Sequence, residues 1–367
     1  MPITKRECQL SSDIKYVDAK DLKRFTKQVF EGLGMPSDDA ATEAEVLVWA
    51  NLRGVDSHGV TRLESYGHAI DAGSMNVRPN IRVLSERAGA IFIEGDLAMG
   101  PVVTSFAVDR VAEKARSAGV GWGLIRNTTH QGAMGYYVEK LALQGLAGIA
   151  VVCNPPNMAP PGAKAAGTHN SPIAFAVPSK ERGAVIFDMA TSIVAFGRLM
   201  VAADRGEDLG EDWALDADGK PTTDPALARL LRPAGGYKGY GLAFMFECFT
   251  SLMAGNALLA PHILQDRAGD KPKGGAQNSF VAAVDISMFT EVASMESEVD
   301  ELVRAEKSLP TVDGVDEVMV PGDPQQRTFE QRSAEGIPMP PGTWDKIVAS
   351  AERFSLELPT ESEAAHG

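Results

Sequence analysis

The segment "VTSFAVDRVAEKARSAGVGWGLIR", residues 103–126, decides the fold class, because a helical pattern passes directly into a strand pattern. Its apolar residues recur at helical spacing as far as Gly119, and "GWGLIR" is then a short β-rich run. Similar runs flank the segment: "AIFIEG" (90–95), "LAGIAVVC" (146–153), "PIAFAVP" (172–178) and "AVIFDMA" (184–190). Such interleaving of helical and strand patterns predicts an α/β layer architecture.

Helices are expected at both ends of the chain. In the first part, one helix begins at Ser37 and runs to Gly54, and the next begins near Ser57. In the last part, an amphipathic helix is expected at 291–307 and a short helix after Pro341. These patterns predict helical regions on either side of the sheet-forming sequence.

One segment, "GYGLAFMFECFTSLMAG" (239–255), is apolar enough to suggest a membrane span. It is short for that purpose and carries Glu247 at its middle, so we interpret it as a buried core helix and expect no membrane association. The opening "MPITKRECQLSSDIKYV" lacks the apolar run of a secretion signal.

The bulk properties narrow the class of protein. A chain of 367 residues is long enough for about two domains. Its 35 basic and 49 acidic residues give a net charge of -14, which argues against a nucleic acid partner because phosphate binding needs clustered Lys and Arg. Three widely spaced cysteines, Cys8, Cys153 and Cys248, indicate reduced thiols and a cytoplasmic location.

A row of three polar side chains stands in "RGVDSHGVTRLESYG", residues 53–67. His58, Arg62 and Tyr66 are four residues apart in turn, so on a helix they would lie on one face. Arg can grip a carboxylate through two hydrogen bonds, Tyr can add another donor, and His can exchange a proton near neutral pH. The row could hold a small acid, although a surface helix whose Arg covers apolar neighbours gives the same pattern.

A second candidate is His130 in "RNTTHQGAMGYY" (126–137), where it follows an apolar strand. Sites in α/β proteins gather where strands end, and Gly132 and Gly135 would allow a ligand to approach closely. His130 is therefore a candidate general acid or base; a histidine that merely caps the next helix is the alternative.

Two further stretches could contact a ligand. Asp188 ends an apolar strand in "AVIFDMATS", where a carboxylate can orient a histidine or bind a ribose hydroxyl, although a helix N-cap is the more ordinary role. Lys238 lies in the glycine-rich "RPAGGYKGYG" (232–241) before the apolar helix, a setting that attracts anions. A flexible turn before a core helix is the alternative there.

Other signals are absent from the sequence. No G-x-G-x-x-G follows a strand, no H-E-x-x-H or G-x-S-x-G occurs, and the histidines show no paired metal-ligand spacing. Asp216, Asp218 and Gly219 imitate the start of a calcium loop, but Lys220 occupies the next ligand position and an Asp-Gly turn explains the stretch better. We therefore expect no metal site.

Six stretches follow one another along the chain: "RGVDSHGVTR", "NTTHQGAMGYY", "FDMATS", "WALDADGKPTTDP", "GGYKGYGL" and "EGIPMPPGTW". Together they resemble the motif series of the malate/L-lactate dehydrogenase family. That family includes sulfolactate and ureidoglycolate dehydrogenases, diketogulonate reductases and piperideine-2-carboxylate reductase. The resemblance extends from about residue 40 to residue 345.

The resemblance implies NAD or NADP as cofactor, bound by a mixed-sheet domain that is not a Rossmann fold. It also implies a helical domain formed by the N-terminal region and C-terminal segments, and a homodimer. We expect an N-terminal helical domain at 1–76, the NAD(P)-binding sheet domain at 77–290 and a C-terminal helical segment at 291–355 that packs back on the helical domain. Residues 356–367 are expected to be a flexible tail.

The resemblance also assigns roles to residues. The family's catalytic histidine falls on His130. Its substrate-side residues fall on Ser57, His58, Gly59, Arg62 and, in members that have the tyrosine, Tyr66. Its cofactor contacts fall on Asp188, Met189, Ala190, Lys238 and Asn154.

One region departs from the family pattern. Where members usually read Gly-Thr-Asn-Pro before an apolar strand, this chain has His169, Asn170, Ser171 and Pro172. Where a serine often follows the cofactor-side asparagine, Pro155 stands instead. We expect the cofactor contacts and the substrate to be affected here.

The expected reaction is hydride transfer between NAD(P) and a small 2-hydroxy or 2-oxo acid, with the proton handled by His130 or by His58. An alternative of the same type is an NADPH-dependent reductase of a cyclic imine acid, piperideine- or pyrroline-2-carboxylate. Alternatives of other classes are a non-catalytic protein that binds a nicotinamide or an acid, and a lyase or hydrolase that uses His130 without a nicotinamide.

Overall fold

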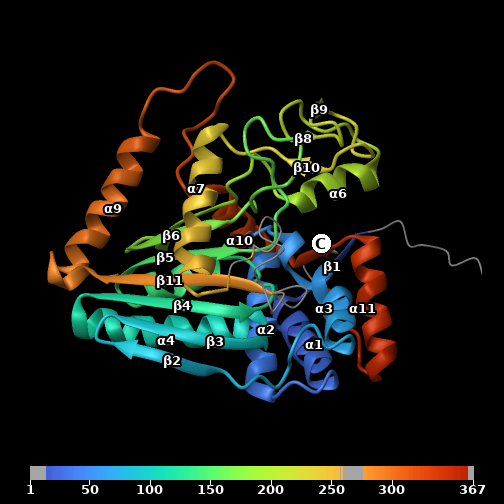
Figure 1. Ribbon diagram of the computed structural model, residues 1–367, viewed down its shortest axis with the longest axis horizontal. Coiled ribbons are helices and arrows are strands. Elements are labelled where there is room, and N and C mark those ends of the chain that lie inside the picture. The colour runs from blue at the N-terminus through green and yellow to red at the C-terminus, as the bar shows by residue number, and fades with distance from the viewer. Residues whose placement is uncertain (1–13, 257, 259–275, 363–367) are drawn as a thin grey trace, which may run out of the picture. The chain divides into compact units, whose positions relative to one another are not determined.

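The computed structural model describes residues 14–256, 258 and 276–362 (Figure 1). The first 13 residues of the opening segment, Cys8 among them, and the last five residues of the expected tail lie outside the described residues. The chain forms two compact units: a helical unit of residues 1–69 and 324–367, and a sheet unit of residues 70–323.

A seven-stranded sheet with the order β2-β3-β4-β11-β5-β6-β7 forms the centre of the sheet unit (Figure 1). The strands are β2 (Arg82–Arg87), β3 (Ala90–Ala98), β4 (Val120–Thr128), β5 (Leu146–Cys153), β6 (Ile173–Ser179), β7 (Gly183–Met189) and β11 (Gln277–Asp285). Only β3 and β4 pair in parallel, whereas a doubly wound dinucleotide-binding fold is built on a mostly parallel sheet. The five predicted runs fall on β3 to β7, and the predicted mixed α/β fold is confirmed.

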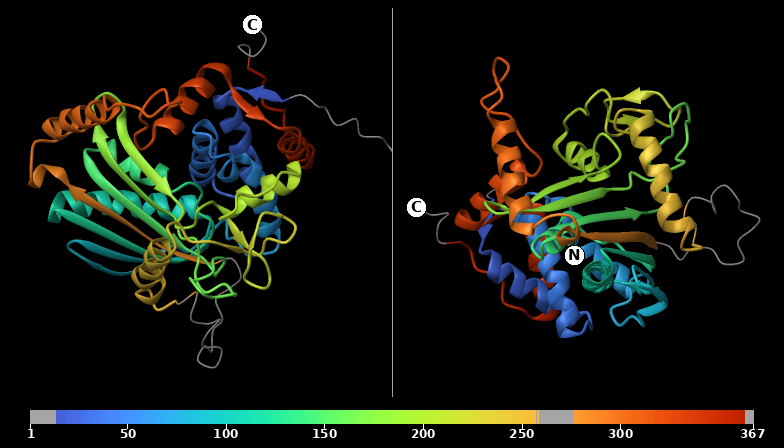
Figure 2. Two further views of the ribbon diagram at one scale, coloured as in Figure 1. Left: turned by 90° about the horizontal axis from the view of Figure 1, so that it is seen from above. Right: turned by 90° about the vertical axis from the view of Figure 1, so that its left-hand side faces the viewer.

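Helices cover both faces of this sheet, as Figure 2 shows. On one face lie α4 (Gly100–Ala118) and α5 (Gly135–Ala142); on the other lie α7 (Tyr237–Glu247) and its π-helical continuation η3 (Cys248–Leu252). The two faces of β4 differ in how closely a helix approaches. On the α4 side the approach is close, because a Cβ at Gly121 would lie 2.2 Å from the carbonyl oxygen of Val111 on α4. The next residue, Trp122, points to the opposite face and stacks on Phe280.

The connection between β7 and α7 has its own small structure. It contains α6 (Phe196–Arg205) and a three-stranded sheet of β8 (Ala214–Leu215), β9 (Pro221–Thr222) and β10 (Leu230–Leu231). Asp216 Oδ1 accepts hydrogen bonds from the backbone of Asp218 and Lys220, and Gly219 has φ +80°. The backbone therefore forms the Asp-Gly turn expected from the sequence.

The helical unit packs α1 (Ala19–Gly32) against α2 (Ser37–Leu52) and α11 (Pro341–Phe354). It also contains the short turns η1 (Asp56–His58) and η2 (Val60–Arg62), α3 (Leu63–Asp71) and α10 (Asp323–Glu335). Strands β1 (Lys15–Val17) and β12 (Ile337–Met339) pair antiparallel. The backbone N–H and hydroxyl of Thr360 donate to Asp21 Oδ2, so the start of the expected tail is tied to α1.

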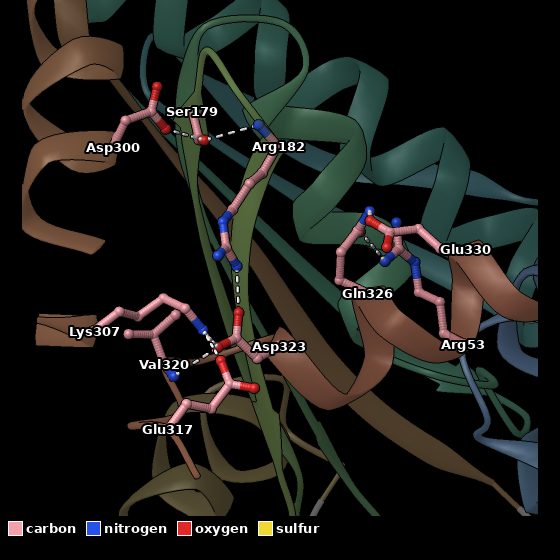
Figure 3. Close-up of polar contacts among 10 residues, drawn as sticks. All are labelled: Arg53, Ser179, Arg182, Asp300, Lys307, Glu317, Val320, Asp323, Gln326 and Glu330. Carbon is pink, nitrogen blue, oxygen red and sulfur yellow. Dashed lines mark hydrogen bonds and ion pairs between the residues drawn. The ribbon is translucent and has the colours of Figure 1, made fainter. Parts of the chain in front are cut away.

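Residues 291–323 lie in the sheet unit, whereas the sequence expectation grouped them with the helical domain. The helix α9 (Val292–Lys307) packs against β6, and η4 (Ile286–Met288) precedes it. The chain after α9 is held by Asp323, which is 3% exposed. Its carboxylate accepts hydrogen bonds from the side chains of Lys307 and Arg182 and from Val320 N (Figure 3). Although desolvation raises it, the bonds from Lys307 and Arg182 lower the pKa of Asp323 to about 2.

The apolar segment 239–255 was predicted to be a buried core helix, and that prediction is wrong for much of its surface. Ala243 and Phe246 face the protein, but Phe244 is 51% exposed and Met253 is 56% exposed. The apolar pattern could not predict this exposure, because a sequence of apolar residues is the same whether its own chain or a partner covers the helix. Among the described residues, no helix is both long and apolar enough to cross a bilayer.

Candidate functional site

The predicted helix near Ser57 does not form as one piece. His58 ends η1, Gly59 is extended with ψ -154°, and Arg62 ends η2 before α3 begins. The row of His58, Arg62 and Tyr66 is therefore a turn followed by a helix, and the prediction of a single helical face is wrong. Gly59 is required at the break, because a Cβ there would lie 2.2 Å from Asn51 Oδ1.

Three residues outside the predicted row hold this turn in place. Asn51 is buried; its Nδ2 donates to Asp56 Oδ1 at 2.7 Å, and its Oδ1 accepts from Val60 N at 2.8 Å. Arg332 on α10 binds Asp56 with both terminal nitrogens, at 2.7 and 3.0 Å, and donates to the carbonyl of Asn51. We call this set of Asn51, Asp56 and Arg332 the clamp; it gives the His58 turn a fixed backbone.

The predicted substrate-side residues lie together on this turn. Ser57 Oγ and His58 Nδ1 are 2.9 Å apart, and Arg62 Nε donates to the carbonyl of Ser57 at 2.6 Å. The two terminal nitrogens of Arg62 make no hydrogen bond within the described part of the chain, so its fork can bind a carboxylate. Desolvation, helped by the charge of Arg62, lowers the pKa of His58 to about 4, so this imidazole is neutral at pH 7.

Tyr66 lies behind the turn rather than on its surface, since it is 2% exposed. Burial raises the pKa of Tyr66; the nearby Glu43 adds to the rise and Arg62 opposes it. Glu43 on α2 is fully buried, and neither of its carboxyl oxygens has a hydrogen-bond partner in the part of the chain that the structure describes. Desolvation raises the pKa of Glu43 well above its ordinary value. Glu43 was missed from the sequence because nothing distinguishes it from the surface acids of an ordinary helix.

In the sheet unit, the other predicted residues gather where strands end. Strands β4 and β5 are each antiparallel to β11, and β6 turns the chain back into β7, so β4, β5 and β7 run in the same direction. His130, Asn154 and Asp188 lie at or just after their last residues. We call this the carboxyl end of the sheet; the topology brings the three side chains to it from distant parts of the sequence.

His130 and Asp188 are connected through one segment. His130 Nδ1 accepts from Gly132 N at 3.3 Å, and Gly135 N at the start of α5 donates to Asp188 Oδ2 at 2.7 Å. Asp188 thus serves the N-terminus of a helix distant in sequence rather than capping the chain that follows it. Desolvation of the carboxyl raises the pKa of Asp188 to about 6, although part of the residue reaches solvent, and the Gly135 N–H opposes the rise.

The start of α7 packs on the chain that follows β7. A Cβ at Gly239 would lie 2.2 Å from the carbonyl oxygen of Thr191, and Ala234 N donates to that oxygen at 2.9 Å. Lys238 is exposed at this first turn of α7. Met189 and Ala190, the other predicted cofactor contacts, are half-buried on the β7 side. The glycine-rich loop is therefore placed against the predicted cofactor residues.

The departing segment also lies at the carboxyl end of the sheet. Asn170 is used for structure, since its backbone N and Oδ1 bond Asn157 at 2.9 and 3.0 Å. Ser171 Oγ lies 3.2 Å from Cys153 Sγ. His169, only 7% exposed, places its Nε2 3.2 Å from Asn154 Nδ2.

Several polar atoms at this end of the sheet have no partner among the described residues. His169 Nδ1, Asn154 Oδ1 and Thr191 Oγ1 are buried there without a hydrogen bond. Such atoms are expensive to bury unpaired, and a ligand rich in amide and hydroxyl groups would satisfy them. The residues present therefore fit a nicotinamide dinucleotide. Within the described ranges, no group of three or more His, Cys, Asp or Glu residues could hold a metal ion.

Comparison with known proteins finds relatives that match nearly the whole chain. The family model for malate/L-lactate dehydrogenase matches residues 17–348. Malate/(S)-sulfolactate dehydrogenase of Methanothermus fervidus is 33% identical over 340 residues, 90% of this chain and 96% of that protein. Ureidoglycolate dehydrogenase (NAD(+)) of Escherichia coli O157:H7 is 29% identical over 318 residues, 87% and 90% of the two chains. The crystal structure of malate dehydrogenase from Entamoeba histolytica superposes with a TM-score of 0.88 at 25% identity, covering 95% of this chain and 100% of that one. The chain therefore belongs to the malate/L-lactate dehydrogenase family.

Proposed function

We propose that this protein is an NAD(P)-dependent oxidoreductase that transfers hydride between the nicotinamide and a small 2-hydroxy or 2-oxo acid. The observation that carries the proposal is the gathering of His130, Asn154, Asp188 and Lys238 around the carboxyl end of one sheet. Family membership supports it, because the relatives are dehydrogenases of malate, sulfolactate and ureidoglycolate. When bound, the nicotinamide supplies or takes up the hydride.

The proton is assigned to His130. In the reducing direction charge grows on the carbonyl oxygen, and a proton from His130 neutralises it; in the oxidising direction the same residue accepts the hydroxyl proton. Gly132 N lies 3.3 Å from Nδ1 and helps to position the ring, and the imidazole is the group assigned to proton exchange. His58 suits a different role, because its lowered pKa of about 4 keeps it uncharged at pH 7 and favours a hydrogen bond to substrate.

The substrate carboxylate is assigned to Arg62. Its Nε is held by the Ser57 carbonyl, which fixes the plane of the guanidinium and directs the terminal nitrogens for two parallel hydrogen bonds. Tyr66 supports Arg62 from the buried side, and Ser57 adds a hydroxyl beside His58. The binding energy of the carboxylate then serves to orient the reacting carbon.

The cofactor is assigned to residues of the sheet unit. Lys238 at the first turn of α7 supplies a positive charge for a phosphate, and Asn154 supplies amide hydrogen bonds. Asp188, Met189 and Ala190 at the end of β7 form the neighbouring wall. The choice between NAD and NADP is part of the test below.

A homodimer is proposed with this function, on the exposed apolar surface of α7 and η3. Tyr237, Leu242, Phe244, Met245, Phe249, Leu252 and Met253 are all exposed there. A surface of this kind marks an interface, and a second copy is the partner that family membership implies. Sedimentation of wild type and Phe244→Glu tests it, with a dimer expected for the first and a shift towards monomer for the second.

The unpaired thiols of Cys153 and Cys248 support a reducing, cytoplasmic setting.

The experiment that tests the function follows reduced-nicotinamide absorbance in mixtures of purified protein, NADH or NADPH, and a panel of acids. The panel holds pyruvate, oxaloacetate, other 2-oxo acids, a diketo sugar acid and a cyclic imine acid. Loss of absorbance with one member identifies the cofactor and the substrate branch together. Reaction with the imine acid alone would move the protein to the imine reductases, and binding of cofactor without any reaction would favour a sensing role.

A further inference from the structure

The pairing of β3 with β4 is interrupted just before His130. Two pairs of residues flank the interruption; between them β3 contributes residues 95–97, whereas β4 contributes only Asn127. The result is a β-bulge in which three residues have left-handed backbones: Asp96, Leu97 and Asn127, with φ of +53°, +55° and +54°. Residues other than glycine seldom adopt this conformation, so other contacts are needed to hold the chain here.

Hydrogen bonds hold Asn127 on both sides of its amide. Its Nδ2 donates to the two carboxylate oxygens of Glu94, at 3.0 and 3.2 Å, and its Oδ1 accepts from Asn256 Nδ2 at 2.7 Å. Its backbone N–H donates to Asn278 Oδ1 at 3.2 Å. Asn278 is fully buried and donates to the carbonyl of Asn256 at 2.8 Å, so these two partners also fix each other. We call Glu94, Asn127, Asn256 and Asn278 the Asn127 network.

Glu94 supplies the charge of this network. The residue is 6% exposed, and Arg126 Nε lies 2.6 Å from its Oε2, so the carboxylate is buried but paired. The backbone N–H of Asp96, inside the bulge, donates to Glu94 Oε1 at 3.2 Å. One charged acceptor therefore holds both strands of the bulge, since Asn127 binds it from β4 and Asp96 from β3.

The chain that leads from Asn127 to His130 is closely packed. Thr129 donates twice to the carbonyl of Ala98, from its backbone N at 3.1 Å and from Oγ1 at 2.9 Å. The carbonyl oxygen of His130 lies at the start of α4, where a Cβ on Gly100 would be 2.3 Å from it. These contacts fix the segment in the direction that Asn127 gives it as it leaves the bulge. A changed backbone at Asn127 would therefore move the imidazole of His130.

We propose that Asn127 is a positioning residue for His130: its left-handed backbone, held by Glu94 and Asn256, directs the segment that places the imidazole against the substrate. The inference rests on the proposed function, in which His130 exchanges the proton. Asn127 itself contacts neither substrate nor cofactor in this scheme, because both ends of its amide are bonded within the chain. Its contribution is therefore to turnover rather than to binding.

The experiment is a double-mutant cycle, measured as kcat with the acid and the cofactor that the panel identifies. Asn127→Ala should lower kcat on the order of tenfold, because the proton donor is misaligned, and should leave the dissociation constant of the cofactor within about twofold. In a His130→Ala background the same substitution should change the residual kcat by less than about twofold, because the group that it positions is gone. A merely structural role would lower kcat by the same factor in both backgrounds.

Asn76→Ala is the matched control. Asn76 Nδ2 donates to Asp96 Oδ2 at 3.1 Å, so this substitution also weakens the bulge without removing a bond of the Asn127 network. It should keep kcat within about twofold of wild type. Asn127→Gly is a second variant, because glycine adopts the left-handed backbone without strain and the substitution removes the amide alone. Its loss of kcat should be smaller than that of Asn127→Ala and should also vanish in the His130→Ala background.

The outcomes separate this inference from the proposed function. Equal losses of kcat in the two backgrounds would overturn the inference while leaving the dehydrogenase standing, and so would a loss in Asn76→Ala as large as that in Asn127→Ala. An Asn127→Ala protein with the kcat of wild type would overturn it as well. Absence of turnover by wild type with every acid and both dinucleotides would overturn the proposed function, and the inference with it.

Discussion

The His58 turn in the helical unit and the carboxyl end of the sheet are built in opposite ways. Around His58, the clamp of Asn51, Asp56 and Arg332 satisfies the polar groups that shape the backbone. At the end of the sheet, polar atoms of His169, Asn154 and Thr191 are buried without a partner among the described residues. The backbone of the first region is held by its own side chains, whereas the second region contains buried side-chain atoms for which a ligand can supply partners.

This difference predicts how each region responds to substitutions and to ligand binding. A turn held by its own hydrogen bonds should keep its shape with or without substrate, and its failure should follow from breaking the clamp. A region with unpaired atoms should gain stability when the cofactor binds, because the ligand supplies the missing partners.

The largest effect is expected for His130→Ala. Turnover should fall by on the order of 10²- to 10⁴-fold, because the growing charge on the carbonyl oxygen loses its proton donor. Cofactor affinity should change little, since the backbone of the 130–135 segment remains tied to β7 through Gly135 and Asp188. Steady-state kinetics and fluorescence titration give the two quantities.

Its control is His68→Ala, which removes an exposed histidine of α3 and should leave both quantities unchanged. His58→Gln should lower turnover less than His130→Ala does, because His58 is neutral at pH 7 and is not the residue assigned to proton transfer. A His130→Ala enzyme as fast as wild type would move proton transfer away from the sheet unit.

The next effect is expected for Arg62→Ala. The substrate KM should rise about a hundredfold, with a smaller fall in kcat, because the carboxylate loses a two-point charged hydrogen bond. Arg62→Lys should recover only part of the affinity, since an ammonium keeps the charge but not the fork. Initial rates over a range of substrate concentrations measure both parameters.

Lys346→Ala is the matched control, because Lys346 is a partly exposed cation of the same unit whose amine lies 3.5 Å from Glu64. It should leave KM as it is. If Arg62→Ala lowers kcat at unchanged KM, the carboxylate is held elsewhere and Arg62 acts on the transition state alone.

The sequence was sufficient where the determining pattern is local. The runs at 90–95 and 146–153 alternate or concentrate apolar residues, so they were correctly assigned as strands. The gathering of His130 and Asp188 followed from the rule that sites lie where such strands end. Each of these inferences needed only the identity of neighbouring residues.

It was insufficient where a partner is distant in the chain. Arg332 is 276 positions from Asp56, and no local pattern joins them, so the clamp was not foreseen. The break at Gly59 depends on the Asn51 side chain occupying the space of a Cβ, which helical spacing cannot reveal. His169 was recognised as a departure, but its bond to Asn154 depends on the pairing of β5 with β6.

Breaking the clamp should have a smaller effect than removing Arg62. In Arg332→Met, Asp56 loses both of its bonds from the guanidinium and the His58 turn loses one support, so kcat/KM should fall about tenfold through a higher substrate KM. Cofactor affinity should stay near wild type, and amide hydrogen exchange should quicken at residues 56–62.

The control for this variant is Gln331→Ala, which alters the preceding residue of α10 and removes only an exposed bond to Glu335. It should match wild type in all three measurements. Unchanged exchange and kinetics in Arg332→Met would show that Asn51 alone holds the turn, and the contrast between the two regions would then rest on that residue.

The smallest effect is expected in the pH dependence of stability at the end of the sheet. Burial holds the pKa of His169 near 3 in the folded protein, whereas an unfolded chain titrates this group near 6.5. Between these values the unfolded state binds the extra proton, so this residue's contribution is fully present above pH 6.5 and is lost as the pH falls. Urea unfolding of wild type and His169→Gln between pH 7.5 and 4.5 should show wild type losing stability faster on acidification, by at most about 1.4 kcal/mol per pH unit.

Asp188, whose raised pKa of about 6 acts with the opposite sign, is common to both proteins and cancels in the difference. The exposed His68 provides the control, since His68→Gln should leave the slope of wild type unchanged. Parallel slopes for wild type and His169→Gln would mean that His169 takes up its proton at an ordinary pH, and that burial at the end of the sheet does not keep this imidazole neutral.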